Sequence, residues 1–202
     1  MNSTGKIAKF TGILFLTAMV ASLVGGGIIE TTRDNSNVFL FTTGIILEIV
    51  NALAVLGIGI LLFPIIKIFH KNGARFYLSL RILESVACLA APLVLVLFAN
   101  SSALRVSFTG TLIPLFFCCG AVVLYTVLYV YRLLPCFISI WGFIGVAGII
   151  VLNLVNIEPN AGMLLALPII LNEILLGTWL IIKGFNQNNL KVLNQKLKTI
   201  KI

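Results

Sequence analysis

Long apolar runs dominate the chain, and short polar segments separate them. Within each run the apolar residues fill every face of a helix, and they do not alternate with polar residues at the period of two that marks a barrel strand. The pattern predicts helices over residues 10–29, 38–66, 76–99, 108–131, 137–156 and 162–182.

The length of these runs indicates membrane spans rather than the core of a soluble protein. About 20 residues of helix cover the ~30 Å hydrocarbon core of a bilayer. Backbone groups in lipid must be satisfied within the chain, which leaves helices or a closed barrel. We therefore expect an all-α fold, an integral membrane bundle of six transmembrane helices in residues 1–184. The short connections favour antiparallel neighbours.

The composition strengthens the membrane interpretation. Hydrophobic residues make up 60% of the chain and charged residues only 10%, whereas a soluble domain carries roughly 25% charged residues. The net charge is +8. We expect no nucleic-acid partner, because the basic residues lie between and after the apolar runs, where they orient a membrane protein.

Lysine and arginine residues fall mainly on one side of the predicted bundle. Of the 14 in the chain, eleven lie on the side that holds both termini, against Arg33 and Arg105 on the other. Positive residues stay in the cytoplasm, so we expect cytoplasmic N- and C-termini in a bacterial plasma membrane. The charges alone leave open a cleaved signal peptide at residues 10–29. That run is long for a signal core, and we expect an uncleaved helix.

The C-terminal residues 185–202 differ from the spans. Leucine and isoleucine recur there at helical spacing, with lysines between them. This pattern predicts a basic amphipathic tail on the inner leaflet, attracted by anionic lipid. A solvated tail is the alternative.

Four ionisable residues interrupt the predicted spans: Glu48, Arg81, Glu84 and Glu173. Each costs roughly 2.5–3.5 kcal/mol at the bilayer centre on insertion scales, so we expect them to face the bundle interior. Arg81 and Glu84 are three residues apart, share one helix face and can pair. Such a pair serves either a function or only the register of its helix.

The three glutamates are predicted to lie at similar depth. At helical rise, Glu84, Glu173 and Glu48 lie about 12, 14 and 15 Å from the nearer end of their spans. Three carboxyl groups near the midplane, from three helices, predict one shared polar site with a single arginine. A neutral site requires protonated carboxyl groups, a bound cation, or the positive charge of Arg132.

Neighbouring polar residues extend this candidate site: Asn51, Asn172, Tyr125, Tyr129 and Arg132. The last three follow one another at spacings of four and three, which predicts one helix face. For the tyrosines, an interfacial aromatic belt is the alternative. The chain has one histidine, His70, and no HExxH, Walker A or dinucleotide-binding motif, so we expect no metal and no cofactor.

Four stretches stand out: "GIILEIVNALAVLGIGILLFPIIK" (44–67), "YLSLRILESV" (77–86), "LYVYRLLPCFISIWGFIG" (128–145) and "NEILLGTWLIIKGFN" (172–186). They resemble a family of bacterial six-span membrane proteins known only as a domain of unknown function. The resemblance covers nearly the whole chain. It implies the six-span topology and places family motif positions at Glu48, Arg81, Glu84, Arg132, Pro135, Gly142, Glu173, Lys183 and Gly184. It implies no reaction.

Three hypotheses of function stay open. The first is a small transporter or proton- or cation-linked membrane protein, whose central acids bind the ion or a small solute. The second is a membrane-embedded enzyme or binder acting on a lipid or isoprenoid, with Arg81 or Arg132 holding an anionic head group. The third is a sensor, immunity or scaffold protein whose polar cluster only fixes helix register.

Overall fold

The computed structural model describes residues 3–32, 37–98, 102–155 and 159–190, and the regular structure in them is helical. The elements are α1 (Ser3–Thr32), α2 (Val38–Phe69), α3 (Lys71–Leu97), α4 (Ser102–Ser107), the π-helical turn η1 (Phe108–Leu112), α5 (Ile113–Val130), α6 (Cys136–Leu154) and α7 (Pro159–Ile182). The prediction of an all-α protein is confirmed.

Six helices in the described residues are long and apolar enough to cross a membrane, as predicted. The fourth span combines α4, η1 and α5 into one stretch. Large apolar side chains point outward from these helices, among them Phe10, Leu53, Phe76 and Leu154. In water such a surface would be unfavourable, whereas acyl chains solvate it, so the fold fits an integral multi-pass membrane protein.

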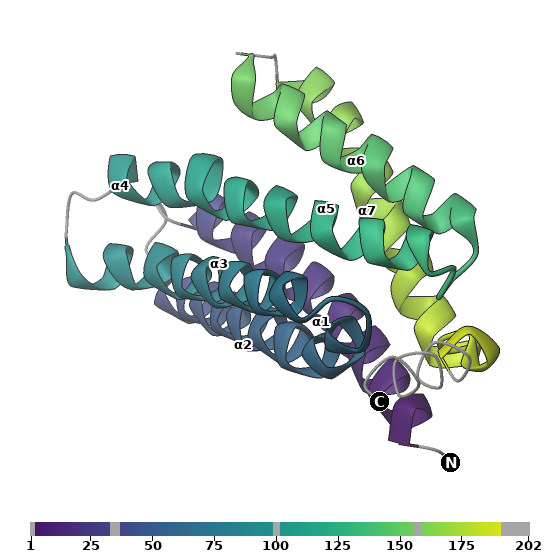
Figure 1. The fold of residues 1–202 in the computed structure, drawn as a ribbon. Helices are drawn as coiled ribbons and strands as arrows, with labels where there is room; N and C mark the ends of the chain where they lie inside the picture. The colour runs from purple at the N-terminus through teal and green to yellow at the C-terminus, as the bar shows by residue number, and fades with distance from the viewer. Residues whose placement is uncertain (1–2, 33–36, 99–101, 156–158, 191–202) are drawn as a thin grey trace.

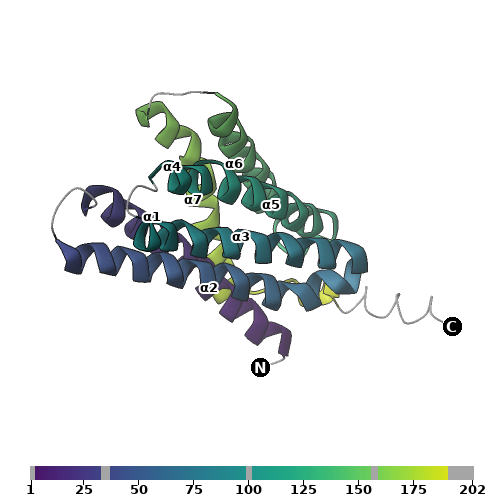
Figure 2. The same cartoon turned by 90° about the vertical axis from the view of Figure 1, so that its left-hand side faces the viewer.

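The six spans form a closed ring. Each packs against its neighbour along the chain, α3 meets the fourth span through α4, η1 and α5, and α7 returns to pack against α1. In Figures 1 and 2, α6 lies beside α5 and α7 crosses behind α5, while α1, α2 and α3 lie close together. Gly12 and Gly177 close the ring, because a Cβ at Gly12 would lie 2.5 Å from the carbonyl oxygen of Gly177. Small residues allow this close helix approach.

The π-helical turn in the fourth span has a local cause. Pro114 has no backbone N–H and cannot complete the hydrogen-bond ladder of a regular helix. Immediately before it, the N–H of Ile113 donates to the carbonyl of Phe108, five residues back. The helix therefore accommodates the proline by widening over one turn, a feature often found at functional sites.

One end of the ring gathers the basic residues, and we call it the basic end. Three contacts show that the helix termini meet there. The rings of Phe69 and Tyr131 stack at 4.2 Å, the N–H of Asn186 donates to Leu133, and a Cβ at Gly184 would touch Ala8. The described basic residues of this end are Lys6, Lys9, Lys67, Lys71, Arg75, Arg132 and Lys183.

Several helices begin before the predicted apolar runs. α1 begins at Ser3 instead of residue 10, and the fourth span begins at Ser102 instead of residue 108. Helical hydrogen bonding there includes polar residues that precede the apolar run, so hydropathy alone places these helix starts too far inward. Most of the predicted amphipathic tail, residues 191–202, lies outside the described residues and stays a prediction.

Candidate functional site

A cavity of about 220 Å³ lies inside the ring, and residues from all six spans line it. Its polar lining includes Asn51, Arg81, Glu84 and Glu173, while side chains such as Phe15, Val55, Ile58, Phe117 and Ile170 form apolar walls. We call it the central cavity. It therefore joins polar groups of α2, α3 and α7 that are up to 122 positions apart in the sequence (51 to 173).

Arg81 and Glu84 form the predicted ion pair on α3. Nη1 of Arg81 lies 3.2 Å from Oε1 and 3.0 Å from Oε2 of Glu84, and Nε donates to the hydroxyl of Tyr77 at 3.1 Å. The guanidinium also lies 5.9 Å from the ring centroid of Phe117. Both charged side chains are almost fully buried. Glu84 thus has its own counter-charge, and the pair as a whole is neutral.

Glu173 of α7 differs from the other acids of the spans. Its carboxyl group makes no hydrogen bond and no ion pair with any residue that the structure describes. It lines the central cavity with Arg81 and Glu84 and is close enough to both to interact with them electrostatically. A carboxyl group in this position is available to a proton, a cation or a solute in the cavity.

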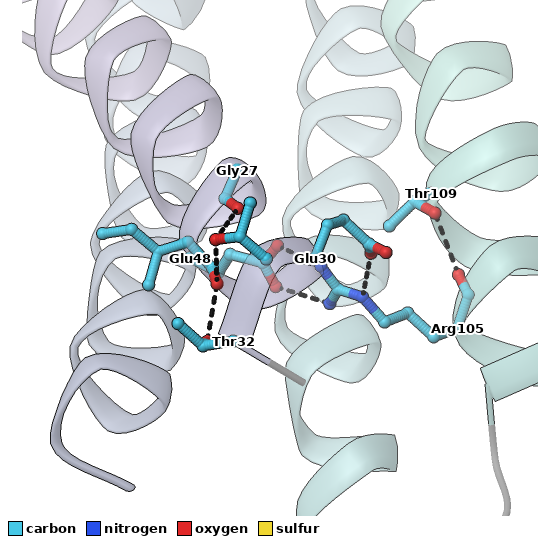
Figure 3. Close-up of polar contacts among 8 residues, drawn as sticks. Gly27, Glu30, Thr32, Glu48, Arg105 and Thr109 are labelled. Carbon is cyan, nitrogen blue, oxygen red and sulfur yellow. Dashed lines mark hydrogen bonds and ion pairs between the residues drawn. The ribbon is translucent and has the colours of Figure 1, made fainter. Parts of the chain in front are cut away.

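Glu48 is held by Arg105, which the sequence analysis had assigned to an outer loop. Nη1 of Arg105 lies 2.8 Å from Oε2 of Glu48, Nη2 lies 2.7 Å from Oε1, and Nε lies 3.3 Å from Oε1 of Glu30 (Figure 3). The fourth span begins early enough to carry Arg105 into the bundle, where it is 2% exposed. The prediction of a single arginine among the acids is therefore wrong. The apolar neighbours Leu104 and Val106 were the sequence signal that could have placed Arg105 inside the fourth span.

The three glutamates occupy two adjoining cavities instead of one shared pocket. Glu48 lines a smaller cavity of about 110 Å³ together with Thr109, whereas Glu84 and Glu173 line the central one. Both cavities are lined by Ser22, Asn51, Cys88 and Ile113. Asn51 lies at this junction, with Nδ2 3.7 Å from Sγ of Cys88. A row of polar groups consequently runs from Arg105 to Glu173 through the bundle.

The remaining predicted site residues lie elsewhere. Tyr125 and Asn172 are buried and joined by a 2.7 Å hydrogen bond from the amide to the hydroxyl, but neither lines the central cavity. Tyr129 is 46% exposed on the outer face, as the aromatic-belt alternative predicts. Arg132 lies at the basic end. The predicted common face of Tyr125, Tyr129 and Arg132 is wrong, because α5 ends at Val130 and Arg132 adopts a left-handed backbone with φ of 47°.

The polar groups that line the two cavities are carboxyl, amide and guanidinium groups, with the hydroxyl groups of Ser22 and Thr109 and the thiol of Cys88. Among the described residues, no group of three or more histidine, cysteine, aspartate or glutamate side chains is placed to hold a metal ion. The chemistry that these groups support is binding of protons, cations or polar solutes by carboxyl oxygens, with the Arg81–Glu84 pair beside them.

Comparison with known proteins identifies a family. Neither the curated proteins nor the solved structures contain a significant match to the chain. A family model described as a domain of unknown function, DUF4386, matches residues 10–184. This match covers five spans in full, α1 from Phe10 onward, and every residue of the central cavity. The chain therefore belongs to the DUF4386 family.

Proposed function

We propose that the chain is a small transporter or proton- or cation-linked membrane protein in which Glu173 is the ion-binding group of the central cavity. The observation that carries this proposal is the unpaired carboxyl group of Glu173 beside a neutral Arg81–Glu84 pair. An ionised carboxylate inside a membrane is unfavourable without a partner. Arg81, the cation that lines the same cavity, is already paired with Glu84. A proton or a bound cation would therefore supply the partner of Glu173.

The adjoining small cavity provides an approach to Glu173. It leads from Glu48, whose carboxylate is bound by Arg105, to the junction at Asn51 and Cys88 and then to the central cavity. We propose that the Arg105–Glu48 pair restricts access at this end. A π-helical turn adjacent to Arg105 gives the fourth span a local element that can rearrange.

The sidedness of this approach follows from the charges. The basic end would face the cytoplasm of a bacterial plasma membrane, because lysine and arginine favour that side. Both termini would then be cytoplasmic, and the cluster of Glu30, Glu48 and Arg105 would lie toward the outside.

Proton flux in proteoliposomes tests the proposal. A membrane potential set by a potassium gradient would drive protons into the vesicles, and an enclosed pH-sensitive dye would report the change in internal pH. We expect flux in the wild type and its loss in Glu173→Gln, because the amide cannot bind a proton or a cation. Glu30→Gln is the matched control, since Glu30 is 62% exposed and lies outside both cavities. Its replacement leaves both contacts between Arg105 and Glu48 in place. Equal flux in the wild type and Glu173→Gln contradicts the proposal.

A lipid or isoprenoid binder is the second candidate, and one observation favours it. Ser22 and Leu23 of α1 line the central cavity and are exposed on the bundle surface, so the cavity reaches the lipid-facing side. An apolar tail could enter there while a polar group meets Arg81. Mass spectrometry of lipids that co-purify with the protein distinguishes the two candidates. A stoichiometric lipid that is lost in Arg81→Gln but kept in Glu173→Gln would favour the binder.

A purely structural cluster is the third candidate. If the Arg81–Glu84 pair only fixes helix register, replacing it with apolar residues of similar volume, as in Arg81→Met with Glu84→Leu, preserves the fold. Loss of proton flux in this double variant, with unchanged thermal stability, would exclude a purely structural role.

A further inference from the structure

A second pocket, of about 550 Å³, lies at the basic end between the α5–α6 turn and the end of α7. Its lining includes Arg132, Pro135 and Cys136 on one side and Trp179, Lys183 and Asn189 on the other. We call it the basic pocket. None of the described residues that line it is acidic, so its two cations have no counter-charge among them.

Neither Arg132 nor Lys183 forms an ion pair with an acidic side chain of the described residues. The guanidinium of Arg132 makes no hydrogen bond or ion pair with the described residues, and its side chain is exposed. The ammonium of Lys183 lies 4.4 Å from the ring centroid of Trp179. That ring is fixed in turn by an edge-to-face contact with Phe137 at 6.4 Å. The ring of Trp179 therefore positions the ammonium group of Lys183, whose N–H donors can still reach a ligand.

The backbone at Arg132 is unusual and firmly held. Its φ of 47° falls in the left-handed region, where glycine is the usual residue at a helix C-terminus. The N–H of Leu133 donates to Leu128 at 3.1 Å, and Nδ2 of Asn189 donates to the carbonyl of Arg132 at 2.9 Å. The fold thus holds the backbone of Arg132 in a strained conformation. The side chain of this arginine makes no hydrogen bond or ion pair with the described residues that would account for its presence. Strained backbone positions of this kind cluster at active sites, ligand clamps and switch regions.

The location of the pocket indicates the ligand. α5 ends at Val130, α6 begins at Cys136 and α7 ends at Ile182, so the pocket lies where the spans leave the hydrocarbon core and lipid headgroups begin. Cys136 is the first residue of α6, and no side chain caps that helix, so its positive end adds to the attraction for an anion. We propose that the basic pocket binds the phosphate group of an anionic phospholipid. This site is separate from the central cavity and does not depend on the function proposed for it.

Native mass spectrometry of the full chain, released from nanodiscs of phosphatidylcholine with or without phosphatidylglycerol, tests the site. We expect the wild type to retain one phosphatidylglycerol more tightly than phosphatidylcholine. Arg132→Gly and Lys183→Gln should each weaken this binding about fivefold, the effect of one basic residue near an anionic lipid. Lys67→Gln is the matched control. Lys67 also lies at the basic end and rests 5.5 Å from an aromatic ring, that of Phe63, but it does not line the pocket.

The Arg132→Gly variant separates binding from folding. Glycine adopts the left-handed backbone without strain, so the variant should unfold at the same temperature as the wild type or at a higher one. Reduced lipid binding with unreduced stability supports the proposal. The absence of a preference for phosphatidylglycerol, or an equal loss in Lys67→Gln, overturns it. Tight binding of inorganic phosphate that depends on Arg132 and Lys183, without any preference among lipids, overturns the assignment to a lipid.

Discussion

Arg105 and Glu48 make the shortest ion pair in the described part of the chain, with two parallel contacts of 2.7 and 2.8 Å between guanidinium and carboxylate. The pair joins the start of the fourth span to a point about one third of the way along α2, and the contact with Glu30 adds the end of α1. These ion pairs connect α1, α2 and α4 in the half of the bundle opposite to the basic end.

Removing one partner of this pair should destabilise the fold more than removing both. Arg105→Gln leaves the Glu48 carboxylate buried without a counter-charge, and we expect a loss of about 3 kcal/mol in the free energy of unfolding. The double variant Arg105→Gln with Glu48→Gln should lose less. Denaturation in mixed micelles measures the difference, with Glu30→Gln as an exposed control that changes stability by at most about 1 kcal/mol. A double variant that is as unstable as the sum of its single variants would contradict the pairing.

Glu84 and Glu173 should respond differently to the same substitution. Glu84→Gln leaves Arg81 buried without its counter-charge, so we expect a loss of about 3 kcal/mol in the free energy of unfolding. Glu173→Gln removes no described contact and should stay within about 0.5 kcal/mol of the wild type. Thermal unfolding in detergent compares the two. Equal destabilisation would show that Glu173 has a structural partner.

Gly142 supports the buried hydrogen bond between Tyr125 and Asn172. A Cβ at Gly142 would overlap the ring of Tyr125, so Gly142→Ala should displace the ring and cost about 1–3 kcal/mol through overpacking. Gly27→Ala is the control, because Gly27 lies in α1 and a Cβ there would have nothing within 4 Å. That change should be neutral or stabilising by up to about 1 kcal/mol. Similar thermal stability in both variants would refute the close approach of α6 to Tyr125.

Cys88 provides a probe of the junction between the two cavities. Its side chain lines both of them and is 4% exposed, so a water-soluble thiol reagent should label it slowly. Arg105→Gln should raise the labelling rate, because the Arg105–Glu48 pair lies at the end of the smaller cavity. The measurement uses a chain in which Cys118, Cys119 and Cys136 are replaced by serine. An unchanged rate would show that this pair does not restrict access.

The spans were predictable because the bilayer imposes their length and their apolar composition. The pairing of Arg81 with Glu84 was predictable as well, since both lie on one turn of one helix. The partner of Glu48 was not predicted, because Arg105 is 57 residues away and hydropathy placed it outside the span. The position of Arg132 depends on a left-handed residue after the last turn of α5, where helical spacing no longer applies. Similarly, depth along each helix does not fix the direction of a side chain, so the separation of Glu48 from Glu173 required the fold.

Infrared difference spectroscopy of the protein in nanodiscs tests the central role of Glu173 most directly. Spectra are compared between alkaline and acidic buffer for the wild type, Glu173→Gln and Glu30→Gln. The account predicts a protonated-carboxyl band on acidification that is weaker in Glu173→Gln than in the wild type. Exposed carboxyl groups, such as that of Glu30, also contribute to the band, but the component lost in Glu173→Gln should differ from the component lost in Glu30→Gln. A band of equal strength in Glu173→Gln, or no band in the wild type, would contradict it.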